Sequence, residues 1–136
     1  MALAALDAQS NPSPWSAKQF QTALSNRCDT VLVLEQAEET AGFIVWQTVL
    51  DESELHLIAT AEAFRRQGVA SQLLAQWFQT ASAQNVQRLL LEVRAGNLAA
   101  QALYAKYGFR ECGRRSGYYS LPDGSREDAV WMEKIC

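Results

Sequence analysis

The sequence predicts an α/β fold of the α+β type, in a single domain that spans residues 1–136. Its 136 residues and its hydrophobic content of 49% suffice for one core, but not for two domains of ordinary size. Three runs rich in β-branched and apolar residues precede residue 61 and are typical of consecutive strands. Beyond residue 68, helical and strand patterns alternate, which indicates a strand–helix–strand–helix order.

The first half of the chain is predicted to contain two helices and a three-stranded meander. Ser16 and Gln19 have the spacing of a capping box, which predicts a helix from Ser16 to Asn26. A shorter helix is expected from Ala2 to Ala8. The strands are expected at residues 30–36, 41–50 and 54–60, where apolar runs are separated by the polar segments "AEET" and "DES".

The second half is predicted to continue with two helices and further strands. Apolar residues recur every four positions from Val69 to Ala81, so a helix is expected from Gly68 to about Ala83. Asn97 is the expected N-cap of the next helix, and Gly108 suits a left-handed position at its end. The remaining elements are a buried strand at 87–93, strands at 109–113, 117–120 and 128–135, and a turn at 122–125.

Composition and charge exclude several classes of protein. No apolar run approaches the roughly 18 residues of a membrane span, and the N-terminus lacks the basic region of a secretory signal, so a cytoplasmic protein is expected. A net charge of −3 argues against general nucleic-acid binding. The three cysteines are odd in number and widely spaced, so neither a metal site nor a disulfide framework is expected.

The stretch "FRRQGVASQLLAQWF", residues 64–78, has the properties of an anion site. A strand that ends near Thr60, a loop with Arg65 and Arg66, and a helix that begins near Gly68 would present unpaired N–H groups and a positive helix dipole. The alternative is that Gly68 only eases a turn and the arginines are solvated, and this stretch alone does not decide between them. Neither a P-loop nor a G-x-G-x-x-G motif occurs.

The segment "RRQGVA" matches the [RQ]-x-x-G-x-[GA] motif of GCN5-related N-acetyltransferases (GNAT). Residues 91–134, beginning "LEVRAGN", resemble the second half of the ribosomal-protein-alanine N-acetyltransferases of the RimI type, and "SPWS" at 13–16 resembles the segment before that family's second helix. The likeness runs from about Ser13 to Lys134. It implies a twisted, mostly antiparallel mixed sheet, flanked by helices, with splayed central strands. The family usually begins with an extra N-terminal strand, and this chain is expected to start too late to contain it.

The resemblance also implies acetyl-coenzyme A as the co-substrate and assigns residues to it. The loop and helix start would hold the pyrophosphate, the end of the third strand would bond the pantetheine arm through its backbone, and Asn97 would contact the cofactor. The residues implied for the loop are Arg66, Gln67, Gly68, Val69, Ala70 and Ser71, and those for the strand end are Ile58, Ala59 and Thr60.

Glu92 is the one acidic residue in the apolar segment "LLLEV", and it shares a strand face with Leu90 and Arg94. On spacing alone, an ion pair with Arg94 is the favoured interpretation. The resemblance instead implies that Glu92 is the general base. Ordinary pKa values of ~4.3 for a carboxyl and ~8 for an α-amine lie far apart, so either burial of the carboxyl or a relaying water is needed.

Tyr104 lies seven residues after Asn97, about two helical turns, and therefore on the same helix face. An aromatic side chain at such a position usually belongs to the core. By resemblance, Tyr104 is the general acid that meets the coenzyme A sulfur. Because the ordinary pKa of a phenol (~10) exceeds that of a thiol (~8.5), both proton donation and a hydrogen bond to the thiolate remain open.

The activity implied by the resemblance is acetyl transfer to the α-amine of a protein N-terminus, with a ribosomal protein that begins with alanine as substrate. The alternatives are acetylation of lysine or a small amine, and a module that binds acyl-coenzyme A without turnover. Glu92 and Tyr104 together argue against the binding module.

The substrate is expected to meet the tail of the chain. By resemblance, Tyr118, Tyr119 and the loop "PDGSRED" form the peptide groove, where Glu127 or Asp128 would meet a basic residue. A nucleic-acid role for the neighbouring arginines, Arg110, Arg114 and Arg115, is less favoured in an acidic chain. His56, the only histidine, is expected to be structural.

Overall fold

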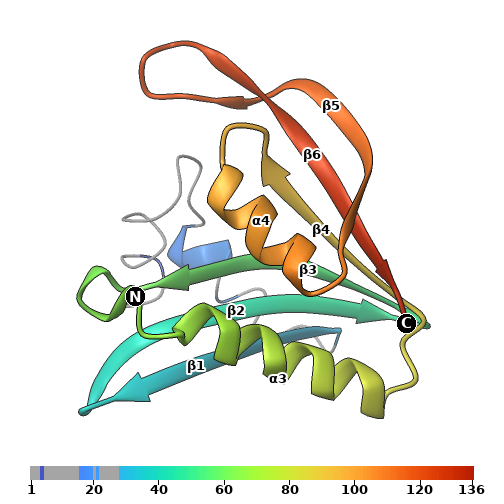
Figure 1. Ribbon diagram of the computed structural model, residues 1–136. Coiled ribbons are helices and arrows are strands. Elements are labelled where there is room, and N and C mark those ends of the chain that lie inside the picture. Colours follow the sequence, from blue (N-terminus) through green and yellow to red (C-terminus); the bar gives the residue numbers. More distant parts are fainter. Residues whose placement is uncertain (1–3, 5–15, 20, 22–27) are drawn as a thin grey trace.

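Figure 1 shows the fold as a computed structural model in which residues 4, 16–19, 21 and 28–136 are described. Helical residues 17–19 and 21 precede the sheet. The elements that follow are β1 (Asp29–Gln36), β2 (Glu39–Val49), β3 (Glu52–Thr60), the 3-10 helix η1 (Glu62–Phe64), α3 (Val69–Ala83), β4 (Arg88–Arg94), α4 (Leu98–Lys106), β5 (Arg110–Ser120) and β6 (Arg126–Ile135).

Six strands form one sheet in the order β1-β2-β3-β4-β6-β5. All neighbouring pairs are antiparallel except β3 and β4, which are parallel. A parallel pair requires a crossover connection, and α3 supplies it. The predicted mixed, mostly antiparallel sheet is therefore confirmed. β1 is an edge of the described sheet, and most of the residues before Cys28, where a family first strand would be sought, lie outside the described residues.

The two parallel strands separate soon after they begin to pair. β3 and β4 are paired only from Glu52 to Leu55 on one side and from Arg88 to Leu91 on the other. Adjacent residues of β2 pair with Leu55 and Leu57, so His56 is an extra residue in β3 and forms a bulge. Bulges bend a strand and end its pairing, which explains why the split starts at this point. The predicted splay of the central strands is confirmed.

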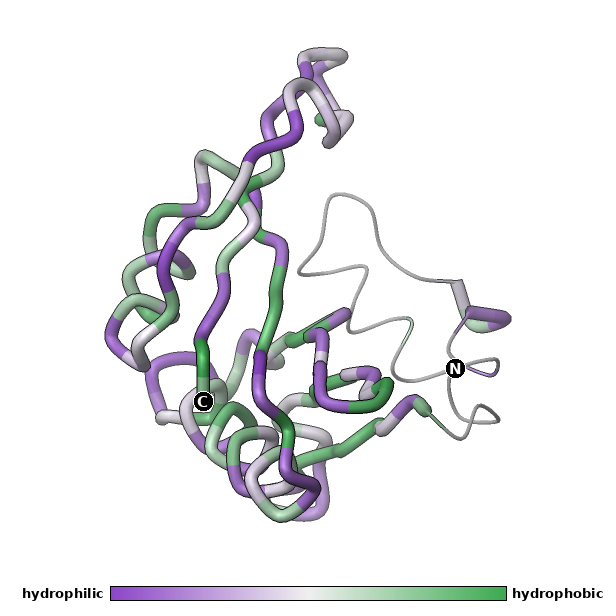
Figure 2. Tube along the Cα trace, turned by 90° about the vertical axis from the view of Figure 1, so that its right-hand side faces the viewer, coloured by the Kyte–Doolittle hydropathy of each residue, from purple (hydrophilic) through white to green (hydrophobic). Residues whose placement is uncertain are grey.

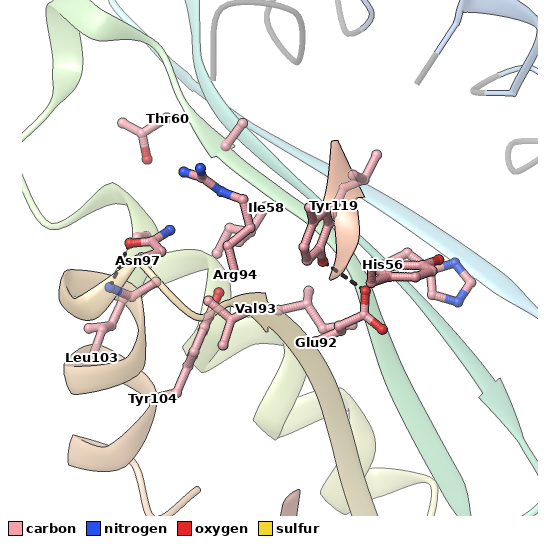
Figure 3. A pocket seen from close by; sticks show the side chains of 16 residues that line it. His56, Ile58, Thr60, Glu92, Val93, Arg94, Asn97, Leu103, Tyr104 and Tyr119 are labelled. Carbon is pink, nitrogen blue, oxygen red and sulfur yellow. Dashed lines mark hydrogen bonds between the residues drawn. The ribbon is translucent and has the colours of Figure 1, made fainter. Parts of the chain in front are cut away.

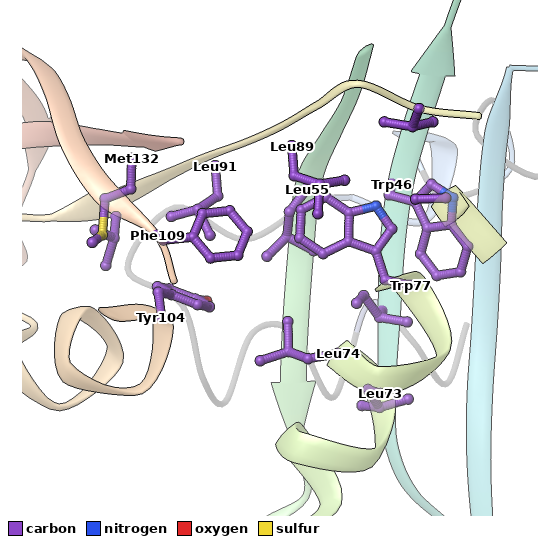
Figure 4. Close-up of a cluster of buried hydrophobic side chains, with 14 of the residues drawn as sticks. Trp46, Leu55, Leu73, Leu74, Trp77, Leu89, Leu91, Tyr104, Phe109 and Met132 are labelled. Carbon is purple, nitrogen blue, oxygen red and sulfur yellow. The ribbon is translucent and has the colours of Figure 1, made fainter. Parts of the chain in front are cut away.

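One large apolar cluster fills the space between the sheet and the two helices α3 and α4 (Figure 4). Trp77 of α3 is fully buried at its centre and stacks on Phe109, with ring centroids 6.0 Å apart. Its indole N–H donates to the buried hydroxyl of Ser53 over 2.9 Å, so this polar group does not lack a partner. The apolar residues that recur every four positions from Val69 to Ala81 therefore lie on the buried face of α3, as predicted.

A second, smaller cluster lies on the other face of the sheet, where Phe43, Val45 and Ala59 are buried and Ala4 packs against them. The bulge in β3 decides which residues join it. Leu55, before the bulge, belongs to the large cluster, whereas Leu57, two residues later, packs on the small one. One extra residue has thus moved the odd-numbered positions of β3 to the opposite face.

Most predicted elements agree with the structure within a few residues. Ser16 and Gln19 form the predicted capping box, with reciprocal bonds of 2.8 and 3.2 Å, and Gly108 has a φ of +95°. Much of the helix expected at 16–26 and nearly all of the helix expected at 2–8 lie outside the described residues.

The prediction of two separate strands at 109–113 and 117–120 was wrong. Residues Arg110–Ser120 form one strand, β5, interrupted by two irregularities of register. Pairing with β6 resumes after each irregularity, so the strand bends at these points without ending.

The hairpin of β5 and β6 extends beyond the rest of the sheet, and its tip is largely hydrophilic (Figures 1 and 2). Every residue of β5 from Arg110 to Ser116 is exposed. Among the described residues, no helix is long and apolar enough to cross a membrane.

Candidate active site

A cavity of about 650 Å³ lies in the split between β3 and β4 (Figure 3). Residues 55–60 of β3 form one wall and residues 92–94 of β4 form the other. Ala70 of α3 and the adjacent Tyr118 and Tyr119 of β5 also line the cavity. The remaining lining residues come from α4 and its cap, namely Asn97, Ala100, Leu103 and Tyr104. The bulge that ends the β3–β4 pairing therefore creates the cavity.

The N-terminus of α3 has the properties predicted for an anion site. Gly68, its N-cap residue, has a left-handed φ of +77°, and no side chain caps the helix. A Cβ on Gly68 would meet no atom within 4 Å, so the space beside this backbone is open. Arg65 and Arg66 are exposed, and neither forms an ion pair within the described part of the chain. The first amides of α3 can therefore bind an anion without displacing a partner.

The predicted cofactor residues divide into two groups. Ile58, Ala59, Thr60, Ala70 and Asn97 line the cavity. The others lie outside its lining at the start of α3: Arg66, Gln67 and Gly68 are exposed, Ser71 is half-buried, and the side chain of Val69 is buried in the core. Val69 can therefore contact a ligand only through its backbone.

Asn97 stands where β4 passes into α4. Its side-chain oxygen accepts from the backbone N–H of Ala100 over 3.1 Å, which confirms the predicted N-cap. Its amide nitrogen lies on the cavity side of the group (Figure 3). Gln101, one turn later, donates to the carbonyls of Arg94 and Ala95 over 3.1 and 2.9 Å. These bonds connect the end of β4 to α4, beyond the point where β4 pairs with β3.

Glu92 is half-buried on the cavity face of β4, between positions that point into the core. The ion pair with Arg94 that spacing favoured does not form. Arg94 instead lies 3.4 Å from Glu127 of β6, and the carboxylate of Glu127 also accepts from the backbone N–H of Gly96. Glu92 accepts a hydrogen bond of 2.7 Å from the hydroxyl of Tyr119.

Tyr104 is buried in the wall of the cavity, and its ring packs edge-on against Phe109. Tyr104 therefore belongs to the core, as an aromatic residue at such a position usually does, and it also lines the cavity. Figure 3 shows its hydroxyl rising from α4 toward the space between the strands. Burial raises the pKa of Tyr104 to about 12, so the phenol stays protonated and can act as a hydrogen-bond donor at any physiological pH.

Three polar residues that the sequence does not predict as part of the catalytic or cofactor site also line the cavity, namely Tyr119, Arg94 and His56. Tyr119 makes the direct contact with Glu92, and His56 lines the wall at the bulge, 3.9 Å from Glu54. The resemblance places Tyr119 in the peptide groove, but nothing in the sequence indicates its contact with Glu92. No local pattern reveals the bulge that brings His56 to the cavity.

The acidic residues expected to meet a basic substrate residue already have partners. Glu127 is paired with Arg94, and one oxygen of Asp128 accepts from the N–H of Gly117 over 2.9 Å. Of the hairpin arginines, Arg114 bonds Glu111 and Arg110 lies 3.4 Å from Glu133. The guanidinium of Arg115 lies 4.6 Å from the ring centre of Tyr118. Among the described residues, no group of three potential metal ligands is found.

The class of protein follows from a comparison with known families. A model of the acetyltransferase (GNAT) family matches residues 1–109, which include the split strands and the α3 crossover. The chain therefore belongs to this family of acetyltransferases, as predicted from the sequence.

Within the family, the chain is similar to enzymes named [ribosomal protein bS18]-alanine N-acetyltransferase. It is 40% identical to the protein of this name from Haemophilus ducreyi over 88% of this chain and 81% of the relative. It is also 40% identical to that of Escherichia coli K12, over 93% and 84%. A crystal structure of the E. coli ribosomal-protein-S18-alanine N-acetyltransferase matches with a TM-score of 0.92 and 36% identity, over 98% of this chain and 85% of that one.

Proposed function

We propose that the protein transfers the acetyl group of acetyl-coenzyme A to the N-terminal α-amine of a ribosomal protein that begins with alanine. The observation that carries this proposal is the cavity in the β3–β4 split, which has an uncapped helix N-terminus near one end and the Glu92 carboxylate toward the other. The similarity to enzymes named for the alanine of ribosomal protein bS18 supports the choice of substrate.

Acetyl-coenzyme A fits this cavity by its chemistry. Its pyrophosphate would bind the backbone N–H groups at the start of α3, with Arg65 and Arg66 beside it. Beyond Leu55, β3 has no partner strand on the β4 side, so the backbone of residues 58–60 is available to the amides of the pantetheine arm. The thioester would then lie near Asn97 and Tyr104.

The pyrophosphate assignment predicts different effects for two substitutions. Gly68→Val should weaken acetyl-coenzyme A binding by about tenfold or more, because φ is +77° there and a side chain would enter the open space beside the amides. Arg66→Ala should cost less, about threefold, because an exposed charge is screened by salt. Isothermal titration calorimetry measures both dissociation constants. Equal losses, or a larger loss for Arg66→Ala, would contradict binding by the backbone.

The reaction needs a neutral amine. At pH 7, an α-amine with a pKa near 8 is mostly protonated, and Glu92 would accept its proton directly or through one water. The neutral nitrogen then attacks the thioester carbonyl carbon, the C–S bond breaks, and coenzyme A leaves as a thiolate. The nitrogen loses its second proton as the amide forms. One of the two protons ends on the thiolate and the other is released to water, so the products are the acetylated N-terminus, coenzyme A and one proton.

Tyr104 would stabilise the departing thiolate by a hydrogen bond. Its pKa of about 12 lies further above that of a thiol than the ordinary phenol value does, so complete proton transfer from Tyr104 is unfavourable. A protonated phenol held rigidly in the core is, in contrast, a good donor to a developing negative charge. Bulk water can then supply the proton to the thiolate after it leaves.

A panel of short peptides that differ only in the first residue tests the proposed function. With acetyl-coenzyme A and the purified protein, we expect acetylation to be fastest on peptides that begin with alanine, detected by mass spectrometry. Equal rates on all first residues would contradict the alanine assignment. Transfer to a small amine, with none to any peptide, would favour the alternative substrate class.

A further inference from the structure

We propose that Tyr119 is a positioning residue for Glu92: its phenol holds one carboxylate oxygen, and the other oxygen is left to take the proton of the attacking amine. This inference rests on the proposed acetyl transfer and adds a residue to its mechanism. It is carried by the contact between the two side chains, by the irregularity of β5 that makes this contact possible, and by the second oxygen of Glu92, which accepts no hydrogen bond in the part of the chain that the structure describes.

Tyr119 reaches Glu92 across an intervening strand. In the sheet order β4-β6-β5, the two residues come from strands that are not neighbours. Two strand spacings place the backbones of a regular sheet about 10 Å apart, and side chains there stand perpendicular to the sheet rather than along it. A regular β5 would therefore not bring Tyr119 to Glu92.

The pairing of β5 with β6 is irregular just before Tyr119, and this changes the position of its side chain. From Arg115 to Tyr119 β5 advances four residues, whereas its partners on β6, Ala129 and Glu127, are two residues apart. The two extra residues of β5 contain the turn at Gly117, whose φ of +58° suits glycine.

Side chains of β6 fix the turn at Gly117 from both sides. Its N–H donates to Asp128 over 2.9 Å, and its carbonyl accepts from Arg126 over 2.8 Å. The direction in which Tyr119 leaves the strand is therefore set by contacts within the hairpin. Tyr118 packs edge-on against Tyr119, with ring centroids 5.2 Å apart, and supports the ring from the neighbouring position.

The contact itself has the direction that a positioning role requires. The Tyr119 hydroxyl donates to Oε1 of Glu92 over 2.7 Å (Figure 3). Burial raises the pKa of Tyr119, and the hydrogen bond to Glu92 raises it further, so the phenol remains a donor and cannot compete with Glu92 as a base. Within the described residues, Oε2 of Glu92 accepts no hydrogen bond, and a carboxylate oxygen has room for one.

A second role for Tyr119 makes a different prediction. If its hydroxyl left Glu92 to bind the peptide, its removal would weaken substrate binding, whether or not Glu92 is present. If it acts through Glu92, its removal should matter only when Glu92 is there to be positioned. A double-mutant cycle separates these two roles.

The cycle compares the wild-type protein, Tyr119→Phe, Glu92→Gln and the double variant. We expect Tyr119→Phe to lower kcat about tenfold, the loss typical of one hydrogen bond to a charged group, with less than about a twofold change in the KM for the peptide. In the Glu92→Gln background, the same change should alter kcat by less than about twofold. Tyr107→Phe is the matched control, because it removes a hydroxyl from the C-cap of α4, which does not line the cavity, and should leave kcat unchanged.

Calorimetry and thermal unfolding complete the test, since a merely structural role would lower Tm or weaken acetyl-coenzyme A binding, and the proposal expects neither. Equal losses from Tyr119→Phe in both backgrounds, or a raised peptide KM with unchanged kcat, would overturn the positioning role. The cycle uses whichever amine the wild-type protein acetylates, so a wrong alanine assignment is recognised separately by the peptide panel. No acetyl transfer to any amine by the wild-type protein would overturn both proposals.

Discussion

Replacing Glu92 with glutamine is expected to lower kcat by about 10²- to 10³-fold at pH 7, the range over which a general base contributes. Glutamine keeps the size of the side chain and can still accept from Tyr119, but it cannot take a proton. Acetyl-coenzyme A affinity should change by less than about twofold, because the pyrophosphate would bind at α3, away from Glu92 on β4. Steady-state kinetics and calorimetry measure the two quantities.

The deficit of Glu92→Gln should shrink as the pH rises. An α-amine with a pKa near 8 is about a tenth neutral at pH 7 and almost entirely neutral at pH 9.5. The variant, which can use only the neutral amine, should therefore recover up to about tenfold relative to the wild-type protein. A loss that stays constant across this range would mean that Glu92 orients the substrate rather than accepting its proton. Glu111→Gln, an exposed change on β5, is the control.

The second large effect concerns which nitrogen is acetylated. A peptide that begins with free alanine and contains internal lysines should gain one acetyl group, on its α-amine. When that α-amine is blocked beforehand, the product should fall at least 100-fold even though the lysines remain. The reason is partly ionisation, because at pH 7 a lysine is neutral in only about one molecule in 2,500, against about a tenth of the α-amines.

Fragmentation of the product in a mass spectrometer locates the acetyl group. The matched control is the same unblocked peptide with its lysines replaced by arginine, which should be acetylated at an unchanged rate. Comparable labelling of lysine in blocked and unblocked peptides would contradict the N-terminal assignment and favour a lysine acetyltransferase of the same fold.

Local features of this protein were predicted well because they depend on residues close together in the sequence. The four-residue recurrence of apolar side chains gave α3 within one residue of its start at Val69. The cap by Asn97 and the left-handed Gly108 were also predicted, since each involves one turn of helix. The GNAT family followed from the motif "RRQGVA" and the segment that begins at Leu91, and the family comparison confirmed it.

Contacts between strands determined two features that local sequence patterns indicated wrongly: the face of the sheet on which a side chain lies, and the partner of a charged residue. Alternation along "ELHLIAT" would place Leu55 and Leu57 on one face, but the bulge at His56 puts them on opposite faces. Spacing favoured an ion pair between Glu92 and Arg94, whereas the structure pairs Arg94 with Glu127, 33 residues away.

The sequence by itself therefore determined the order of the strands and α-helices from β1 to α4, the family and the residue types available for chemistry. The tertiary structure alone decided where β3 and β4 separate, which is at the bulge at His56, and that Tyr119 rather than Arg94 contacts Glu92. The physical reason is that strand register and bulges result from pairing between distant segments. The free energy of a given register depends on both paired strands and on the core that packs against them. It therefore cannot be predicted from one short stretch of sequence.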